Sequence, residues 1–511
     1  MSCQLNAKTS IFKNSMKKII TLLVLALIPV LSSAEISLSG IIGDNMVLQR
    51  NTVVKLWGKA ERNKTVTVTP SWDRHSYKVK AAGDGSWLVN IRTGDAGGPY
   101  SIRISDGNER VLQNILLGEV WICGGQSNME MPVCGFMYQP VEHSSETILE
   151  SMENPSVRLF TVPRISKTEA IDTCGGAWKT SSPASVCEFS AVGYFFGRTL
   201  TRALQGIPVG LIAMNWGGSN IEAWMTEECI DAIPGIDHRL AKSQTGDNSA
   251  PQRLYNGMVN PIRNFASKGF IWYQGESNRY NWFDYKKLMV AMVDLWRKVW
   301  GNAEMPFYYV QLAPYTYDGD LFRSLPLLIE AQYGAQAEIP HSGIAATTDL
   351  GNRTCIHPQK KIEVGRRLAY LALANDYGIE GLPRPAPTFR SMESVQDERR
   401  GKMLVLSFNH LSGKGRWNDP DSFRGYLPEG YTKPGGFEIA GQDRVYHPAQ
   451  ANYVWWENRI EVWSEEVPEP IAVRYAFRNF CREANVVTTM GQPLVPFRTD
   501  DWPVEDVGKL Q

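Results

Sequence analysis

The sequence predicts an α/β fold built on a parallel sheet, with a β-rich region before and after it along the chain. From Leu117 to about residue 380, apolar strand-like runs such as VGLIAM and GFIWY alternate with longer helical patterns such as YKKLMVAMVDLWRKVW. A buried strand followed by a helix, repeated several times, is typical of a parallel sheet. The chain has 511 residues, more than one hydrophobic core usually organises, so we expect two or three domains.

Short strands with alternating polar and apolar residues predict the two flanking regions. Residues 35–116 contain TVTVTPSW, SWLVNIRT and YSIRISDG, separated by Gly, Asp and Asn turns, which is the spacing of a small β-sandwich. Residues 381–511 return to strands, as in MLVLSFN and IAVRYAF. We therefore divide the chain into an N-terminal β region (35–116), an α/β domain (117–380) and a C-terminal β region (381–511), which could pack against the N-terminal one.

The N-terminus has the pattern of a secretory signal. Lys17 and Lys18 precede the apolar run from Ile19 to Leu31, and the small residues SSA follow and end at Ala34. The run is shorter than the roughly 20 residues that a membrane-spanning helix requires. We expect residues 1–34 to be a signal peptide cleaved near Ala34, and the remaining chain to be secreted or periplasmic without a membrane anchor.

Charge and cysteine content exclude several classes of partner. The chain has 53 basic and 53 acidic residues, interspersed, so we expect no nucleic-acid or polyanion partner. Seven cysteines remain after the leader is removed, and in an exported protein the shortest candidate pairs are Cys123 with Cys134 and Cys174 with Cys187. No CxxC or HxxxH pair occurs, so we expect no metal site. Nothing in the sequence specifies an oligomeric state.

Four polar loops follow strand-like runs of the α/β domain. GGQSN follows EVWIC, NWGGSN follows VGLIAM, GESN follows FIWYQ, and the segment from Asp349 to His357 follows GIAATT. Ligands of open α/β sheets bind beyond the carboxyl ends of the strands, where such loops meet. The sequence therefore predicts a site formed by these four loops.

Two residues of these loops suit nucleophilic catalysis. A serine hydroxyl needs a base to remove its proton, and the resulting oxyanion needs preorganised donors. Ser127 lies between a strand and a predicted helix or turn, so its amide would lie near a helix N-terminus. Of the seven histidines, only His357 lies in a loop leaving a late α/β strand, which makes it the candidate base. Taken one at a time, the alternative for Ser127 is an ordinary turn residue, and the alternative for His357 is a structural histidine.

The other two loops offer oxyanion donors. Gly217 and Gly218 would let the backbone approach a substrate closely, and the QGESN loop supplies the side-chain amides of Gln274 and Asn278. An ordinary tight turn and a helix N-cap are the alternatives for these two loops.

Taken in order, GGQSNM, NWGGSNIEAWM, WYQGESN and DLG…IHP resemble the SGNH hydrolase superfamily, and specifically the bacterial sialate O-acetylesterase and acetylxylan esterase-related family. The resemblance extends from Asn45 into the C-terminal β region. It implies a flavodoxin-like three-layer α/β/α catalytic domain with N-terminal and C-terminal β-rich accessory regions. It also implies Ser127 as nucleophile, His357 as base, and an oxyanion hole of the Ser127 amide, Gly218 and either Gln274 or Asn278.

The chain departs from this pattern before the histidine. Many relatives resemble DIHP or DxxH, with a carboxylate two or three residues earlier, where this chain has Cys355 and Thr354. The candidates to orient His357 are then Asp349, which we prefer, Glu276 or a backbone carbonyl; without one, a Ser-His dyad remains.

The functional hypothesis is a carbohydrate O-acetylesterase, similar to sialate 9-O-acetylesterases, that works by acyl transfer from sugar to serine to water without a cofactor. Glu276, Arg253 and Tyr255 are candidates to contact the acetylated sugar, which the loops do not specify among sialic acid, xylan and pectin. One alternative is a carbohydrate-binding protein with a degenerate esterase site, favoured by the missing acid. A lipase or thioesterase is the other, but the sequence has no long apolar lid segment near these loops.

Overall fold

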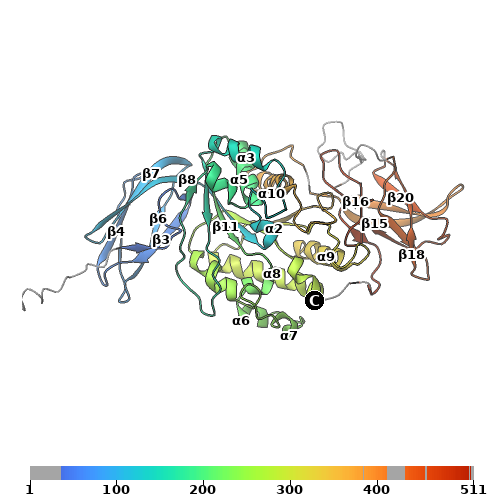
Figure 1. Ribbon diagram of the computed structural model, residues 1–511, viewed down its shortest axis with the longest axis horizontal. Coiled ribbons are helices and arrows are strands. Elements are labelled where there is room, and N and C mark those ends of the chain that lie inside the picture. The colour runs from blue at the N-terminus through green and yellow to red at the C-terminus, as the bar shows by residue number, and fades with distance from the viewer. Residues whose placement is uncertain (1–35, 384, 411–431, 455–456, 506, 508–511) are drawn as a thin grey trace, which may run out of the picture.

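The computed structural model describes residues 36–383, 385–410, 432–454, 457–505 and 507. The expected signal peptide at residues 1–34 lies outside the described residues. In Figure 1 the N-terminal β region, the α/β domain and the C-terminal β region follow one another along the long axis of the molecule. The two β regions lie at opposite ends, so the expectation that they pack together is wrong. No helix within the described ranges has the length and apolarity needed to cross a membrane.

A mostly parallel sheet forms the centre of the molecule. Its strands are ordered β10-β9-β11-β8-β12-β13-β14, and all neighbours are parallel except β10, which is antiparallel to β9 at the edge. Every residue of β11, β12 and β13 is buried, as in sheets covered on both faces. The predicted α/β class is therefore confirmed. The strands are β8 (Glu109–Gly125), β9 (Val157–Thr161), β10 (Lys179–Thr180), β11 (Val209–Asn215), β12 (Gly269–Tyr273), β13 (Phe307–Val310) and β14 (Ser342–Ala345).

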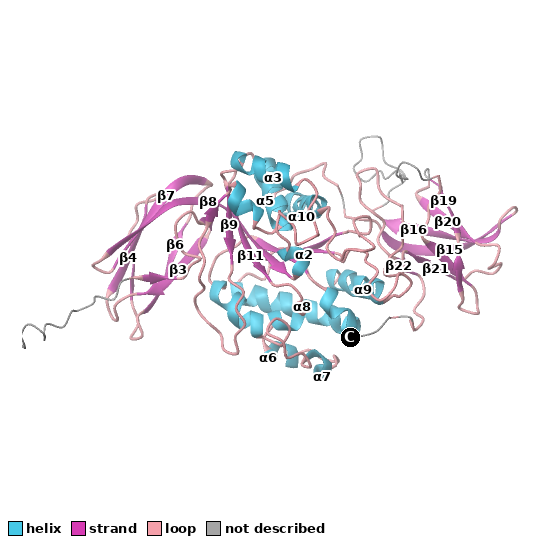
Figure 2. Ribbon diagram, in the orientation of Figure 1, coloured by secondary structure: helices cyan, strands magenta, loops and turns pink. Residues whose placement is uncertain are grey.

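Helices cover both faces of this sheet (Figure 2). α3, α5 and α10 lie on one side, and α6, α8 and α9 on the other. The buried residues Leu288, Met292 and Trp296 of α8 recur every four positions, the spacing of one helical face, and Gly301 closes this helix with a φ of 69°. The helices are α2 (Ser127–Glu130), α3 (Ser144–Glu150), α4 (Pro183–Cys187), α5 (Ala191–Ala203), α6 (Glu227–Asp231), α7 (His238–Ala241), α8 (Trp282–Trp300), α9 (Ser324–Gln336) and α10 (Lys361–Asp376).

One strand, β8, belongs both to the N-terminal region and to the central sheet. Its first part pairs antiparallel with β7, and its last part, up to Gly125, pairs in parallel with β11 and β12. The boundary expected between residues 116 and 117 therefore falls inside a continuous strand. The N-terminal strands are β1 (Ser37–Leu38), β2 (Val47–Gln49), β3 (Val53–Lys59), β4 (Thr65–Pro70), β5 (Tyr77–Lys80), β6 (Ser86–Arg92) and β7 (Gly97–Ser105).

The C-terminal region consists of two four-stranded antiparallel sheets around a hydrophobic core of their own. It is attached to the central domain through α9, because Arg498 donates two hydrogen bonds to Glu330 and the buried Asn479 side chain accepts from the Leu325 amide. The strands are β15 (Thr388–Asp397), β16 (Gly401–Asn409), β17 (Phe437–Ala440), β18 (Tyr446–Pro448), β19 (Gln450–Val454), β20 (Arg459–Trp463), β21 (Ala472–Tyr475) and β22 (Phe497–Arg498).

Candidate active site

Ser127 is the first residue of α2 and follows β8 after one turn residue. The turn depends on Gly125, whose φ is 141° and where a Cβ atom would lie 2.1 Å from the carbonyl oxygen of Tyr273. Only glycine permits this approach of two strands. The first residue of a helix has no helical acceptor for its amide, so the Ser127 N–H is available to a bound anion.

The side chain of Asn128 connects the nucleophile turn to two other loops. Its Nδ2 donates to Oε1 of Glu276 at 2.5 Å and to the carbonyl oxygen of Ile356 at 3.1 Å, and the residue is only 1% exposed. Ile356 is the residue before His357. Asn128 therefore holds the backbone beside Ser127 against the backbone beside His357, although 230 positions separate the two residues along the chain.

Two buried ionisable groups flank Asn128. Nζ of Lys361 donates to its Oδ1 and lies 5.4 Å from the centre of the Tyr273 ring. Burial lowers the pKa of Lys361 to about 7, although the nearby Glu276 opposes the shift. Burial also raises the pKa of Glu276, whose Oε2 has no hydrogen-bond partner among the described residues. We call Glu276, Asn128 and Lys361 the Asn128 network.

His357 is held by a loop that lies soon after Ser127 in the sequence. Its Nδ1 is 2.5 Å from Oε1 of Gln139, and its ring packs edge-on against Phe136 with 5.2 Å between ring centres. Burial, with a smaller contribution from the positive charge of Lys361, lowers the pKa of His357 to about 4. The imidazole is therefore neutral at physiological pH. An amide oxygen only accepts, so Nδ1 carries the proton and Nε2 is the basic nitrogen.

Asp349 does not occupy the position expected of it. Its two carboxylate oxygens accept from the Arg367 guanidinium at 2.7 and 2.6 Å, while Nδ1 of His357 faces Gln139. The buried guanidinium needs an opposite charge, which Asp349 provides. The expectation that Asp349 orients His357 is therefore corrected: Asp349 forms a structural ion pair.

The glycine loop after β11 lies against the nucleophile turn. A Cβ atom at Gly217 would be 3.4 Å from Cβ of Ser127. The Gly217 amide donates to Oε2 of Glu130 at 2.5 Å, whereas no acceptor for the Gly218 amide is found among the described residues. Gly218 has a φ of 73°, which favours glycine at this position. Of the two amides, that of Gly218 is the one available to an oxyanion.

The side chains of Gln274 and Asn278 are already fully engaged. Gln274 Nε2 donates to the Ser219 carbonyl at 3.0 Å and to Asn278 Oδ1 at 2.7 Å. Asn278 Nδ2 donates to Glu222 at 2.9 Å and to Asn281 at 3.1 Å. Both residues are 0% exposed. Their expected role as oxyanion donors is corrected, because each amide group has two hydrogens and both already have acceptors; they fix the loop instead.

The three residues expected to contact sugar have different surroundings. Glu276 is 9% exposed and belongs to the Asn128 network, which suits its alternative role as an orienting group. Tyr255 is buried at the start of the short π-helix Tyr255–Val259. Arg253 is half-buried. Burial leaves Tyr255 a packing role, and of the three side chains Arg253 is the most open to solvent.

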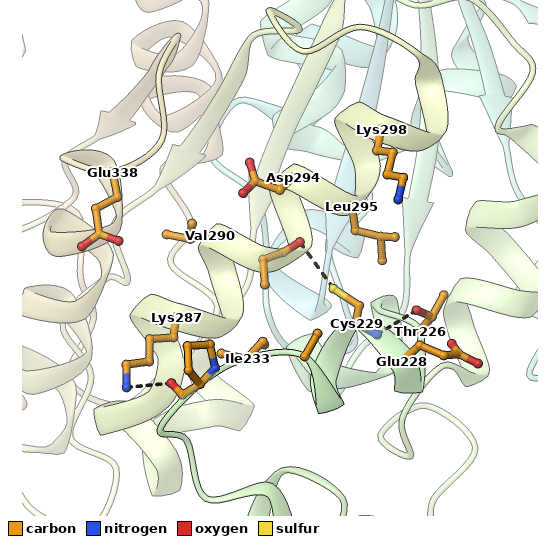
Figure 3. A pocket seen from close by; sticks show the side chains of 13 residues that line it. Thr226, Glu228, Cys229, Ile233, Lys287, Val290, Asp294, Leu295, Lys298 and Glu338 are labelled. Carbon is orange, nitrogen blue, oxygen red and sulfur yellow. Dashed lines mark hydrogen bonds between the residues drawn. The ribbon is translucent and has the colours of Figure 1, made fainter.

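A cavity of about 740 Å³ lies away from these loops, between α6 and α8 (Figure 3). Its wall combines apolar residues such as Val290 and Leu295 with charges of both signs, among them Lys287 and Asp294. None of the four motif loops contributes to it. This cavity is therefore separate from the loops that carry Ser127 and His357.

Comparison with known proteins identifies the family of this chain. Residues 117–374 match the family described as carbohydrate esterase, sialic acid-specific acetylesterase. The chain belongs to this family. It is 32% identical over 390 residues to the sialate O-acetylesterase of Homo sapiens, covering 69% of this chain and 73% of that protein. A solved carbohydrate acetylesterase from Xanthomonas citri is 34% identical, with a TM-score of 0.80 over 92% of this chain and 100% of that chain.

The family match covers all four motif loops in one stretch, but the residues that join those loops were not found from the sequence. Asn128 belongs to the GGQSNM motif, but only its neighbour Ser127 was predicted to take part in catalysis. Lys361 lies four positions after His357, at the first position of α10. Gln139 carries no motif at all. In this member of the esterase family, the contacts that assemble the site come from tertiary packing.

Replacing Asp349 separates its structural role from a catalytic one. Asp349→Asn removes the charge that faces the buried Arg367, and we expect unfolding free energy to fall by about 1–3 kcal/mol. We expect kcat on a small acetyl ester to stay within about threefold of the parent value, since His357 has another partner. Denaturant titration and steady-state kinetics measure the two effects. If the variant is as stable as the parent but its kcat is a hundredfold lower, Asp349 does contribute to catalysis.

Proposed function

We propose that the chain is a carbohydrate O-acetylesterase of the sialate O-acetylesterase type, acting through Ser127 and His357 in an SGNH-type three-layer domain. The supporting observation is the Asn128 side chain, which joins the backbone beside Ser127 to the Ile356 carbonyl beside His357 at 3.1 Å. Gly217 packs on Ser127 from a third loop. Nucleophile, base and amide donors thus come from loops that are physically connected, as acyl transfer requires.

The reaction proceeds in two acyl-transfer steps. His357 takes the proton of the Ser127 hydroxyl as the oxygen attacks the acetyl carbonyl, and the amides of Ser127 and Gly218 donate to the oxyanion. The sugar oxygen leaves with the proton, and water then hydrolyses the acetyl-enzyme by the same route. Among the described residues the Ser127 hydroxyl makes no hydrogen bond, to His357 or to any other group, so the proposed mechanism requires it to reach the imidazole when substrate binds.

Gln139 takes the place of the missing acid. Its Oε1 accepts from Nδ1 of His357, which leaves Nε2 as the nitrogen that receives the serine proton. An amide fixes the tautomer as a carboxylate does, but it stabilises the imidazolium less because it carries no charge. The carbohydrate-binding alternative gains support from this weaker partner. Esterase activity is favoured because nucleophile, neutral base and free amides occur together.

We further propose that residues 1–34 direct export with cleavage near Ala34, and that the substrate is an acetylated sugar. Sialic acid is the first candidate because the related human protein is a sialate O-acetylesterase. Acetate release from acetylated sialic acid, xylan and pectin, measured side by side, distinguishes these sugars.

Removing the nucleophile tests the proposal directly. Ser127→Ala deletes the hydroxyl that forms the acetyl-enzyme, so we expect kcat on a chromogenic acetyl ester to fall at least about a thousandfold with the fold retained. Ser243→Ala, at an exposed serine outside the motif loops, is the matched control and should keep full activity. Turnover by Ser127→Ala near the parent value, with an unchanged circular dichroism spectrum, would exclude this mechanism.

The pH dependence tests the environment of His357. Only the neutral imidazole accepts a proton, so kcat/KM should be constant above its pKa and fall as the pH drops through about 4. Gln139→Glu places a carboxylate beside Nδ1 and favours the imidazolium, so the acid limb should move up by about one to two pH units. Gln205→Glu adds the same charge beyond the end of α5 and should leave the profile unchanged. If the parent, Gln139→Glu and Gln205→Glu proteins all have the same acid limb, Gln139 does not affect the pKa of the base.

A further inference from the structure

Cys134 and Cys187 lie next to each other although 53 positions separate them along the chain. The Cys134 amide donates to the Cys187 carbonyl at 3.0 Å, and the Val133 amide donates to Phe189 at 2.9 Å. The two thiol sulfurs and a carboxylate oxygen of Glu188 lie within 4.8 Å of one another. Cys134 is exposed and Cys187 half-buried, so both are open to reagents from solvent.

This contact differs from the pairs that are shortest along the sequence. Cys123 is fully buried within β8, and the Cys174 thiol lies 3.7 Å from the Ser39 hydroxyl. The backbone hydrogen bond from Cys134 to Cys187 instead goes with thiol sulfurs that lie within 4.8 Å of one another, whereas a disulfide needs about 2.05 Å between them. Rotation of the two side chains is the movement that would bring the sulfurs together.

The pair lies at the base of the loop that holds the candidate base. After Cys134, Gly135 turns with a φ of 82°, and Phe136 and Gln139 exchange two backbone hydrogen bonds of 3.0 and 2.9 Å. This short hairpin carries both groups that contact His357, the Phe136 ring and the Gln139 amide. A covalent bond at Cys134 would fix one end of the hairpin to α4, which ends at Cys187.

We propose that Cys134 and Cys187 form a disulfide that fixes the hairpin against His357. The oxidant is a small-molecule disulfide such as oxidised glutathione. The Cys134 thiolate attacks one of its sulfurs and releases the first thiol, and the Cys187 thiolate then attacks Cys134 and releases the second. The protein dithiol loses two electrons and two protons, and one small disulfide becomes two thiols. The bond itself does not depend on the proposed function, but its effect on turnover does.

Two chemical features bear on how the bond forms. Burial and the neighbouring Cys187 thiol raise the pKa of Cys134 to about 11, so exchange should be faster at alkaline pH, where more thiolate is present. A zinc ion is the competing occupant of the two thiols and Glu188. These residues provide three ligands, whereas structural zinc sites use four protein ligands, and this favours the disulfide.

Thiol counting and mass spectrometry test the proposal. After incubation of the purified mature chain with oxidised glutathione at pH 8, denatured protein should show five reactive thiols where the reduced chain has seven. A proteolytic digest without reductant should contain the Cys134 peptide linked to the Cys187 peptide. Cys134→Ser should lose the linked peptide, and Cys481→Ser, at a half-buried cysteine of the C-terminal region, should retain it. Seven free thiols, a different linkage, or one equivalent of zinc in the purified protein would overturn the proposal.

The oxidised chain should also differ in stability and rate. We expect Tm to rise by about 3–8 °C on oxidation. We expect kcat on a small acetyl ester to be about two- to fivefold higher than in the reduced chain, with Cys134→Ser insensitive to oxidation. If the oxidised and reduced chains have the same kcat, the disulfide does not act on His357 through the hairpin. The linked peptide would still establish that the bond forms. Loss of activity in every form would instead count against the proposed function.

Discussion

The hydrogen bonds of the Asn128 side chain are the constraint on which the rest of the site depends. They join a turn after β8, a loop after β12 and the segment after β14, three places that the chain reaches far apart in sequence. A buried amide that loses a partner costs about 1–3 kcal/mol for each group left unpaired. The bonds therefore form together, and the backbone beside Ser127 cannot move away from the backbone beside His357 without breaking them.

The same network contributes to the electrostatics around the candidate base, His357. Lys361 and Glu276 are both buried, and the amide of Asn128 bridges them. The positive charge of Lys361 adds to burial in lowering the pKa of His357, and the uncharged Gln139 does little to oppose it. The His357 imidazole is therefore neutral at physiological pH, so it can accept a proton, but its low pKa means that it binds the proton weakly. In the proposed mechanism, the amide donors to the oxyanion would therefore carry more of the transition-state stabilisation than in an enzyme with a charged acid.

Local sequence patterns predicted the features that depend on local sequence. The apolar runs gave the buried strands, and the position of GGQSN and NWGGSN after two of them placed these loops at one edge of the sheet. The predictions that were wrong concern side chains whose hydrogen-bond partners are brought near only by tertiary packing. Asp349 faces a buried arginine rather than the imidazole. Gln274 donates to Ser219 and Asn278, and Asn278 donates to Glu222 and Asn281. No periodicity encodes such choices, and the same holds for Gln139, which approaches His357 only because its hairpin folds back.

The continuity of β8 has a consequence for how the molecule can be divided. This strand, which ends at Gly125 just before the Gln126–Ser127 turn, begins in the N-terminal sheet, where it pairs with β7. Severing the polypeptide near residue 117 would cut the strand where its pairing passes from β2 and β7 to β11, beside Leu117 and Val120, both buried here. The strand that leads to Ser127 therefore ties the N-terminal sheet to the esterase domain, and a truncation or domain exchange that keeps this strand intact has to carry both.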